Sequence, residues 1–302
     1  MKVALGIDIG GTKIAVAAIT MDGALLAPVR TLPTPARAGG EEILGAVAQL
    51  GAQTIEQTDV DLEVVGVGSA GTIDGNGRVI AATSLLTDWT GTDIASVLSR
   101  EFGVPVVAIN DVHAGGYGQH AAAAQPGTTL FVAVGTGIGG ALIVDGELVF
   151  GSDFTAGSIG HMIVEPASPV RCSCGEPGHL EALASGSGLE GIYREQVGPV
   201  ESLKEVAQRA RGGERAAQLI IARGGQCLGI GLASAAALIN PDRIVVSGGL
   251  LDLGELYWDV VAQSFSERAI GPLAATPITP SVLGNDAVLI GAARWALHKI
   301  NV

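Results

Sequence analysis

"VALGIDIGGTKIAVAAITMDGALL" (residues 3–26) is the stretch that decides the fold. Its apolar segments are separated by a Gly-Gly-Thr turn and an Asp-Gly turn, which predicts three strands joined by tight turns. The stretch "LFVAVGTGIGGALIVDGELV" (130–149) repeats this order with a Gly-Thr-Gly turn. An internal repeat of this kind indicates a duplicated pair of lobes.

Strands and helices alternate in the rest of the chain, which predicts an α/β fold. Strands are expected at 62–71, 104–111 and 243–251, and helices at 216–239 and 286–300. The longer helix should close at Asn240-Pro241, and the C-terminal helix should return to the first lobe. We therefore expect an N-terminal lobe over 1–117, joined by 286–302, and a C-terminal lobe over 118–285 that carries a Cys- and His-rich loop at 157–186.

Charge and composition exclude several classes of partner. The 302-residue chain has a formal net charge of −13, whereas nucleic acids and anionic membranes bind basic surfaces. The longest apolar run (228–239) is shorter than the roughly 20 residues needed to span a bilayer. Three cysteines do not form a disulfide framework, and no targeting segment is visible. We expect a cytoplasmic protein.

The glycine turns point to phosphate. "GTGIGG" (135–140) matches the spacing of the dinucleotide fingerprint, but that motif requires a helix after it, and a hairpin pattern follows here. In a hairpin, glycines let the backbone approach a ligand and aim N–H groups at phosphate oxygens. One such turn could equally be an ordinary hairpin. Two matching copies and a third Gly-Gly turn at 248–249 favour phosphate binding.

The loop at 157–186 contains His161, Cys172, Cys174 and His179. Two imidazoles and two thiols form a set of soft ligands that suits a structural, tetrahedral zinc ion. The alternative is that both cysteines are small buried residues. We assign no site role to Cys227, which lies in an apolar helical stretch, or to the remaining histidines at 113, 120 and 298, which we expect on the surface or in packing.

Four motifs together resemble the ROK family of bacterial sugar kinases and repressors. They are "DIGGTK" (8–13), "IND" (109–111), "GTGIGG" (135–140) and "CSCGEPGHLEALASG" (172–186). The resemblance covers essentially the whole chain. It implies a duplicated, two-lobed, actin-like and hexokinase-like ATPase fold with ribonuclease H-like lobes and an active-site cleft. It also implies ATP, Mg²⁺ and structural Zn²⁺ as cofactors and a sugar as substrate; we expect a homodimer or homotetramer.

The resemblance also assigns roles to residues. It places ATP at Asp8, Gly10, Gly11, Thr12, Lys13, Gly135, Thr136, Gly137, Gly248 and Gly249, with Asp8 linked to magnesium. It places the sugar at Gly71, Asn110, Asp111, Ser158, His161 and Glu181. Asp111 matches the family's catalytic base, although an aspartate after a strand could simply cap a helix. At 179 the family pattern has a third cysteine, and the histidine found here is a residue type that can also bind zinc.

Departures from the family pattern fall on the sugar contacts. "GSIGH" (157–161) has Ser158 where family glucokinases have a glutamate, "SAGTIDGNG" (69–77) lacks a proline, and "TSLLTDW" (83–89) lacks an asparagine. A smaller residue leaves room for a C2 substituent, which favours phosphorylation of N-acetylmannosamine at O6, with glucose as the alternative. A non-catalytic sugar-binding protein and a repressor are further alternatives. A repressor is disfavoured because the first phosphate turn begins within ten residues of Met1.

Overall fold

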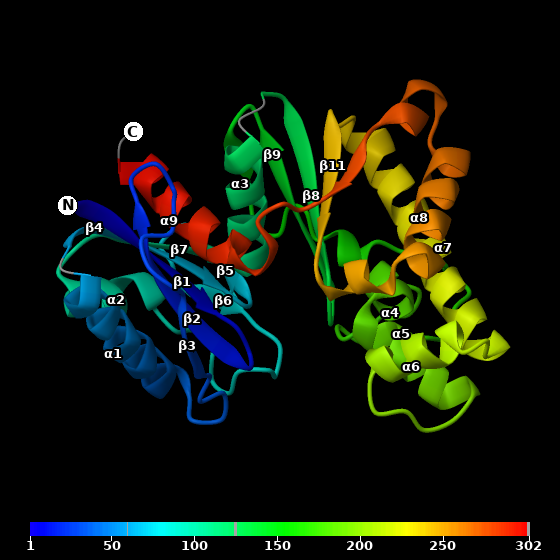
Figure 1. Cartoon of the computed structure of the whole chain (residues 1–302), viewed down its shortest axis with the longest axis horizontal. Helices are drawn as coiled ribbons and strands as arrows, with labels where there is room; N and C mark the ends of the chain where they lie inside the picture. Colours follow the sequence, from blue (N-terminus) through cyan, green and yellow to red (C-terminus); the bar gives the residue numbers. More distant parts are fainter. Residues whose placement is uncertain (59, 124–125, 301–302) are drawn as a thin grey trace. The chain divides into compact units, whose positions relative to one another are not determined.

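A computed structural model describes residues 1–58, 60–123 and 126–300 (Figure 1). Contacts divide the chain into unit 1 (Met1–Pro126, Gly146–Ala156 and Val282–Val302) and unit 2 (Gly127–Asp145 and Gly157–Ser281). The expected lobe boundary after residue 117 differs from this division. It would cut helix α3 (Asp111–Ala123), which packs along its length on the C-terminal helix α9 (Ala287–Ile300) and therefore belongs to unit 1 as a whole.

Unit 1 is built on a sheet with the strand order β3-β2-β1-β4-β7. Its strands are β1 (Lys2–Ile9), β2 (Lys13–Thr20), β3 (Arg30–Pro33), β4 (Asp61–Ser69) and β7 (Val106–Asn110). β2 runs antiparallel to β1, whereas β4 is parallel to β1 and β7 is parallel to β4. A small hairpin of β5 (Thr72–Ile73) and β6 (Val79–Ala81), and the short β10 (Glu147–Val149), complete the strands described in this unit.

Helices cover both faces of this sheet (Figure 1). α1 (Gly40–Thr58) and α2 (Ile94–Phe102) pack on one face, where Leu5 and Ile7 of β1 point. α9 packs on the other face, where Ala4 of β1 points. Because alternate residues of a strand face opposite sides, a nearly continuous apolar sequence is what a doubly covered strand requires.

Unit 2 repeats this topology. It holds β8 (Thr128–Val134), β9 (Ile138–Val144), β11 (Arg243–Ser247) and β12 (Ile278–Pro280) in the order β9-β8-β11-β12. β9 is antiparallel to β8, while β11 is parallel to β8 and β12 is parallel to β11. These are the order and directions of β2-β1-β4-β7, so the predicted duplication is confirmed.

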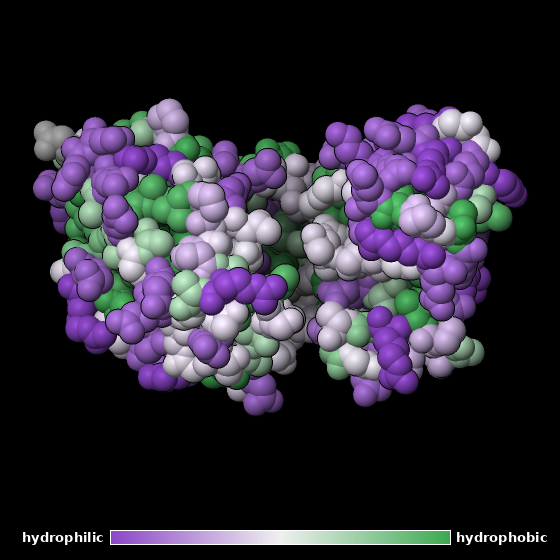
Figure 2. Space-filling model, turned by 90° about the horizontal axis from the view of Figure 1, so that it is seen from below, coloured by the Kyte–Doolittle hydropathy of each residue, from purple (hydrophilic) through white to green (hydrophobic). Residues whose placement is uncertain are grey.

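The α-helices described in unit 2 are α4 (Leu180–Ala184), α5 (Gly186–Gln196), α6 (Leu203–Arg211), α7 (Arg215–Ile239) and α8 (Glu255–Arg268). The 3₁₀ turns described in this unit are η1 (Ile159–His161), η2 (Gly249–Leu253) and η3 (Gly271–Ala275). A further 3₁₀ turn, η4 (Gly284–Asp286), lies in unit 1. α7 ends before Asn240, as predicted, and Asn240 has the left-handed conformation of a helix C-cap. By length and composition α7 could cross a membrane, but 67% of its apolar 18-residue stretch is buried inside the protein, and the helix packs on α8. It is the core helix of unit 2. On the face shown in Figure 2, apolar patches are scattered among polar residues in both units.

One predicted strand is displaced. The sequence places a third strand directly after the Asp22-Gly23 turn, but residues 24–29 form a single bridge, between Ile19 and Leu25, and β3 begins only at Arg30. Pro28 stands in this interval and has no backbone N–H to donate to a ladder. The register of β2 with β3 is therefore set after the proline.

Candidate functional site

The first glycine turn, residues 10–13, joins β1 to β2. The N–H of Gly10 donates to the carbonyl of Lys13 at 3.0 Å. Thr34, which follows β3, donates its hydroxyl to the carbonyl of Gly10 at 2.7 Å and its N–H to that of Thr12 at 3.0 Å. The four residues assigned to phosphate, Gly11 among them, thus lie in one turn that Thr34 holds from the end of β3.

Two partly buried carboxylates lie at the same end of this sheet. Asp8 pairs in register with Gly68 on β4, which pairs with Ile109 on β7, and Asp111 follows that strand. Burial, together with the negative charge of Asp111, raises the pKa of Asp8 to about 7, against the opposing effect of Lys13. Burial also raises the pKa of Asp111. Paired carboxylates in such surroundings suit proton transfer or a divalent cation.

Asn110 caps helix α3, and Asp111 shares one of its backbone donors. The side-chain oxygen of Asn110 accepts from the N–H groups of Val112 at 2.9 Å and His113 at 3.2 Å, which is N-cap geometry. Its amide nitrogen donates to the carbonyl of Gly71 at 3.0 Å and to Oδ1 of Asp111 at 2.9 Å. Asn110 therefore orients the aspartate, whose Oδ1 also accepts from the N–H of Val112 at 2.9 Å.

The second glycine turn, residues 135–137, joins β8 to β9 in unit 2. Within it, the N–H of Gly135 donates to the carbonyl of Gly137 at 2.9 Å. The first turn of α5 holds it from outside: Gly186 donates its N–H to Gly135, and Ser187 donates its hydroxyl to the carbonyl of Thr136 at 2.7 Å. Helix α5 thus fixes the backbone of this turn.

The third glycine pair follows β11, whose end lies beside the end of β8 in the parallel ladder. Gly248 has a φ of +109°, and a Cβ there would lie 2.4 Å from the carbonyl oxygen of Val134. Only glycine fits this position. Gly249 begins η2, and no atom lies within 4 Å of where its Cβ would be. The second glycine turn and the Gly248-Gly249 pair, both assigned to ATP, thus follow neighbouring strands at one end of the sheet.

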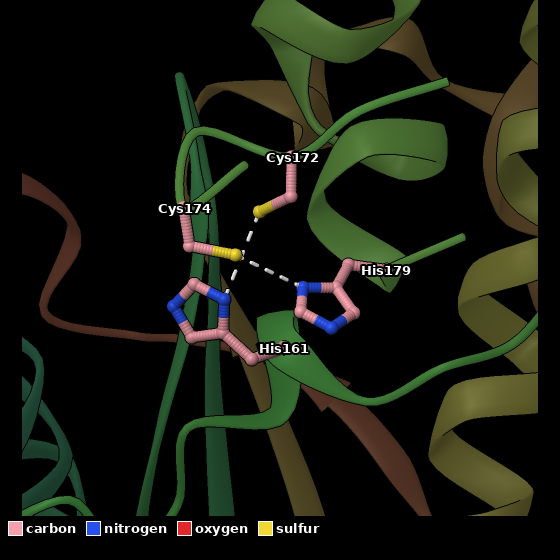
Figure 3. A group of neighbouring side chains, drawn as sticks. All are labelled: His161, Cys172, Cys174 and His179. Atoms are coloured by element: carbon pink, nitrogen blue, oxygen red, sulfur yellow. Dashed lines mark hydrogen bonds between the residues drawn. The ribbon is translucent and has the colours of Figure 1, made fainter. Parts of the chain in front are cut away.

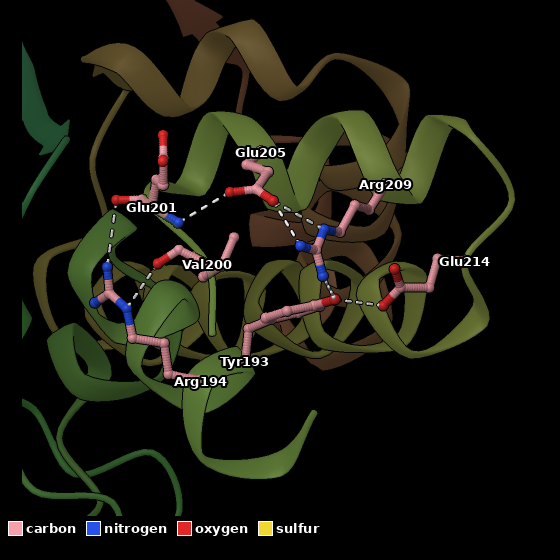
Figure 4. A network of polar contacts seen from close by, with 7 residues as sticks. All are labelled: Tyr193, Arg194, Val200, Glu201, Glu205, Arg209 and Glu214. Carbon is pink, nitrogen blue, oxygen red and sulfur yellow. Dashed lines mark hydrogen bonds and ion pairs between the residues drawn. The ribbon is translucent and has the colours of Figure 1, made fainter. Parts of the chain in front are cut away.

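Helix α5 is anchored at its far end by a polar network (Figure 4). The hydroxyl of the buried Tyr193 donates to Oε1 of Glu214 at 2.6 Å and accepts from Nη1 of Arg209 at 2.8 Å. Arg209 also pairs with Glu205 on α6 at 2.5 Å. The network ties α5 to α6 and to the start of α7, so the helix that holds the second glycine turn is fixed at both ends.

The four residues predicted to bind zinc come together (Figure 3). The ligand atoms of His161, Cys172, Cys174 and His179 all lie within 4.8 Å of one another. Sγ of Cys172 is 3.7 Å from Nδ1 of His161, and Sγ of Cys174 is 3.2 Å from Nδ1 of His179. Bonds of about 2.3 Å to sulfur and 2.0 Å to nitrogen place tetrahedral donors roughly 3.3–3.8 Å apart, so the donor set fits zinc.

Glu181, assigned to the sugar, lies on α4 two residues after the last of these four. Its Oε2 accepts from the backbone N–H of Ile138 at 3.0 Å, immediately after the second glycine turn. Its Oε1 accepts from the hydroxyl of Ser173 at 2.7 Å and from the thiol of Cys172 at 3.4 Å. The carboxylate therefore joins the Cys/His cluster to the glycine turn.

Ser158 lies in an exposed position directly before η1, and His161 ends that turn. Gly157 has a φ of +88°, and its Cβ would lie 2.6 Å from the carbonyl oxygen of Gly140 on β9. The backbone at Gly157 therefore lies against β9, directly before Ser158, the position at which family glucokinases have a glutamate. Asp8, the first turn, Gly71, Asn110 and Asp111 belong to unit 1, and the remaining assigned residues belong to unit 2.

Two side chains beside the assigned residues have no site role in the sequence analysis. His113 is buried two residues after Asp111, with Nε2 3.0 Å from the carbonyl oxygen of Ala156 and its ring edge-on to Phe150. This is a packing position, one of the two expected for it. Ser173 donates to Glu181 at 2.7 Å, and its place inside the Cys-x-Cys pair is the sequence signal that could have found it.

Comparisons with known proteins agree with these features. Residues 4–299 match the ROK family. The glucokinase of Thermotoga maritima is 29% identical over 98% of this chain and 98% of its own length. The N-acetylmannosamine kinase of Escherichia coli O157:H7 is 31% identical over 97% of both chains. The solved ROK family glucokinase of Streptomyces griseus, in complex with glucose and AMPPNP, has a TM-score of 0.81 at 30% identity, covering 98% of this chain and 99% of that one. The expected hexokinase-like fold is confirmed.

Proposed function

The chain belongs to the ROK family and is an ATP-dependent sugar kinase, and we propose that it phosphorylates an N-acylated hexosamine, N-acetylmannosamine, at the 6-hydroxyl. One observation carries the assignment of the reacting groups: the partly buried pair Asp8 and Asp111 lies at the end of the sheet that bears the first glycine turn. Phosphoryl transfer needs a phosphate cradle, a divalent cation and a base for the attacking hydroxyl.

Asp111 acts as the general base. As the sugar O6 bonds to the γ-phosphorus, the bond from that phosphorus to the β,γ-bridging oxygen breaks, and Asp111 takes the hydroxyl proton. Burial raises the pKa of Asp111, which makes its carboxylate a stronger base than an exposed aspartate. Asn110 holds the carboxylate in place, and Asp8 would hold Mg²⁺, which neutralises phosphate charge when bound.

Ser158 supports the choice of sugar. Its short hydroxyl leaves space where a glutamate would contact the C1–C2 edge of an unmodified hexose, and a larger C2 substituent could use this space. Identities of 29% to a glucokinase and 31% to an N-acetylmannosamine kinase are consistent with either substrate. Glucose is therefore the second candidate.

The test is a panel of hexoses and N-acylhexosamines in a coupled assay of ADP release. We expect the highest kcat/KM for N-acetylmannosamine. A higher kcat/KM for glucose would overturn the choice of sugar but keep the kinase, whereas no phosphorylation of any sugar would overturn the kinase assignment. Ser158→Glu should raise kcat/KM for glucose by about tenfold, the scale of one hydrogen bond to a charged group. Ser152→Glu, at an exposed serine in unit 1, is the control for the added charge.

Zinc at the Cys/His cluster has a structural role in this proposal. His161, Cys172, Cys174 and His179 would hold the ion, which would order the loop that carries His161 and Glu181. Metal analysis should give about one zinc per chain. Cys174→Ser should lose the metal and weaken sugar binding more than ATP binding, whereas Cys227→Ser, in the core of unit 2, should keep it. A fully active, metal-free native chain would contradict this role.

The reaction is assigned to the cytoplasm. All three cysteines are free thiols in the structure, and two of them belong to the metal cluster. Thiols of this kind are kept reduced in the cytosol.

A further inference from the structure

The carboxylate of Glu181 is fixed from two sides. One oxygen accepts from the N–H of Ile138, the first residue of β9, at 3.0 Å. The other accepts from the hydroxyl of Ser173 at 2.7 Å. A carboxylate has about four acceptor positions, so two protein donors leave room for two hydroxyls of a ligand. With its plane set by these donors, the carboxylate meets those hydroxyls in one orientation.

Gly137 shows how closely this carboxylate is held to the second glycine turn. A Cβ at residue 137 would lie 2.6 Å from Oε2 of Glu181, inside van der Waals contact. A Cβ at residue 135, in contrast, would have no atom within 4 Å. The glycine at 137 therefore leaves the space that Glu181 fills, and a displaced Glu181 would remove the partner of the Ile138 N–H.

Ser173 is the donor that survives metal binding. Cys172 also reaches Oε1 of Glu181, at 3.4 Å through its thiol proton. A cysteine that ligates zinc is a thiolate and has no proton to donate. The hydroxyl of Ser173 does not depend on that ionisation, because it lies between the two cysteines without being a ligand atom of the cluster.

We propose that Ser173 is a positioning residue for the sugar: its hydroxyl holds the Glu181 carboxylate in the plane that receives sugar hydroxyls, and through Glu181 it also steadies the second glycine turn. The inference rests on the proposed function, since it takes Glu181 as a sugar ligand. Its main effect is on the sugar KM, because the hydroxyl of Ser173 acts through a sugar ligand, Glu181, and is not itself a reacting group.

The experiment compares Ser173→Ala, Ser173→Thr and Ser168→Ala. Ser168 lies in the same loop, and its hydroxyl accepts from the N–H of Val170 without reaching Glu181, so it is the control for a lost loop hydroxyl. Ser173 is exposed and water can replace part of its bond, so we expect the sugar KM of Ser173→Ala to rise roughly three- to tenfold. Its KM for ATP should rise less, kcat should stay within about twofold, and the zinc content should be unchanged. Ser173→Thr keeps the hydroxyl and should restore the sugar KM.

The outcomes separate this inference from the proposed function. An active wild type with an unchanged sugar KM in Ser173→Ala overturns the inference alone. Loss of zinc from Ser173→Ala, or an equal rise in KM for Ser168→Ala, also overturns it, because Ser173 would then act only on loop order. A wild type that phosphorylates no sugar in the panel overturns the proposed function and, with it, the placement of Glu181 at a sugar.

Discussion

The two glycine turns have the same strand pattern and different neighbours. The first turn is held by backbone and hydroxyl contacts from Thr34 beyond β3, and it shares its sheet edge with Asp8 and Asp111. The second turn is held by the start of α5 and by Glu181, which comes from the metal loop. Duplication therefore preserved the hairpin, whereas the groups around each copy diverged.

This difference separates two kinds of task. Partly buried carboxylates with raised pKa values suit proton transfer and cation binding, so the first turn lies where the reacting groups are. A turn tied to a cluster of soft ligands suits the ordering of a loop that contacts the substrate. Changes beside the first turn should act mainly on kcat or on pH dependence, and changes beside the second on ligand binding and stability.

The largest expected effect lies beside the first turn. Asp111→Asn removes the base but keeps the shape of the side chain and a hydrogen-bond acceptor for the N–H of Val112. General bases contribute about 10²–10⁴-fold, so kcat should fall by at least about 100-fold. Steady-state kinetics gives kcat, and calorimetric titration should show that the variant still binds the sugar.

Asp145→Asn is the control for this change, because Asp145 lies in an exposed hairpin turn of unit 2. It should leave kcat near the wild-type value. Near-normal turnover in Asp111→Asn would refute the assignment of the base and reopen the reading of the chain as a sugar-binding protein.

Local patterns in the sequence were enough to predict the hairpins, the duplication and the closing of α7 at Asn240. The third strand begins later than its pattern predicts, because the Asp-Gly turn is a stronger local signal than Pro28, which delays pairing until Arg30. Contacts between distant residues were beyond reach. Glu181 meets Ile138 across 43 positions, and no spacing within either motif reveals that this carboxylate is the reason for glycine at 137.

A second effect is on pH dependence, again beside the first turn. Asp8 has a pKa of about 7 in the folded chain because of burial and of Asp111, against 3.8 as its ordinary value. Its contribution to stability is therefore present below pH 3.8 and is lost as the pH rises to about 7. Because asparagine does not ionise, the Asp8→Asn variant does not lose this stability as the pH rises. Without divalent cations, the variant should exceed the wild type in free energy of unfolding, by at most roughly 4 kcal/mol above pH 7.

Urea denaturation between pH 4 and pH 8 measures this difference, which should be small at pH 4 and should narrow again when Mg²⁺ binds the wild type. Asp22→Asn is the matched control, because hydrogen bonds, led by that of Thr20, lower the pKa of this exposed aspartate in the other turn of the hairpin. Its effect should have the opposite sign. Parallel pH profiles for Asp8→Asn and the wild type would show that Asp8 is not destabilised by ionisation.

The smallest effect tests the second turn directly, by adding one methyl group at two positions in it. Gly137→Ala places its Cβ 2.6 Å from Oε2 of Glu181, so the carboxylate must move and release the N–H of Ile138. A cost of about 1–3 kcal/mol in free energy of unfolding is typical for such crowding. Gly135→Ala should leave stability nearly unchanged, since no atom lies within 4 Å of its Cβ, yet it should raise the KM for ATP if phosphate approaches this backbone. In a Glu181→Ala background, Gly137→Ala should cost less, because the clash has gone. Equal costs at 135 and 137, or an unchanged cost without Glu181, would show that the carboxylate is not what holds the second turn.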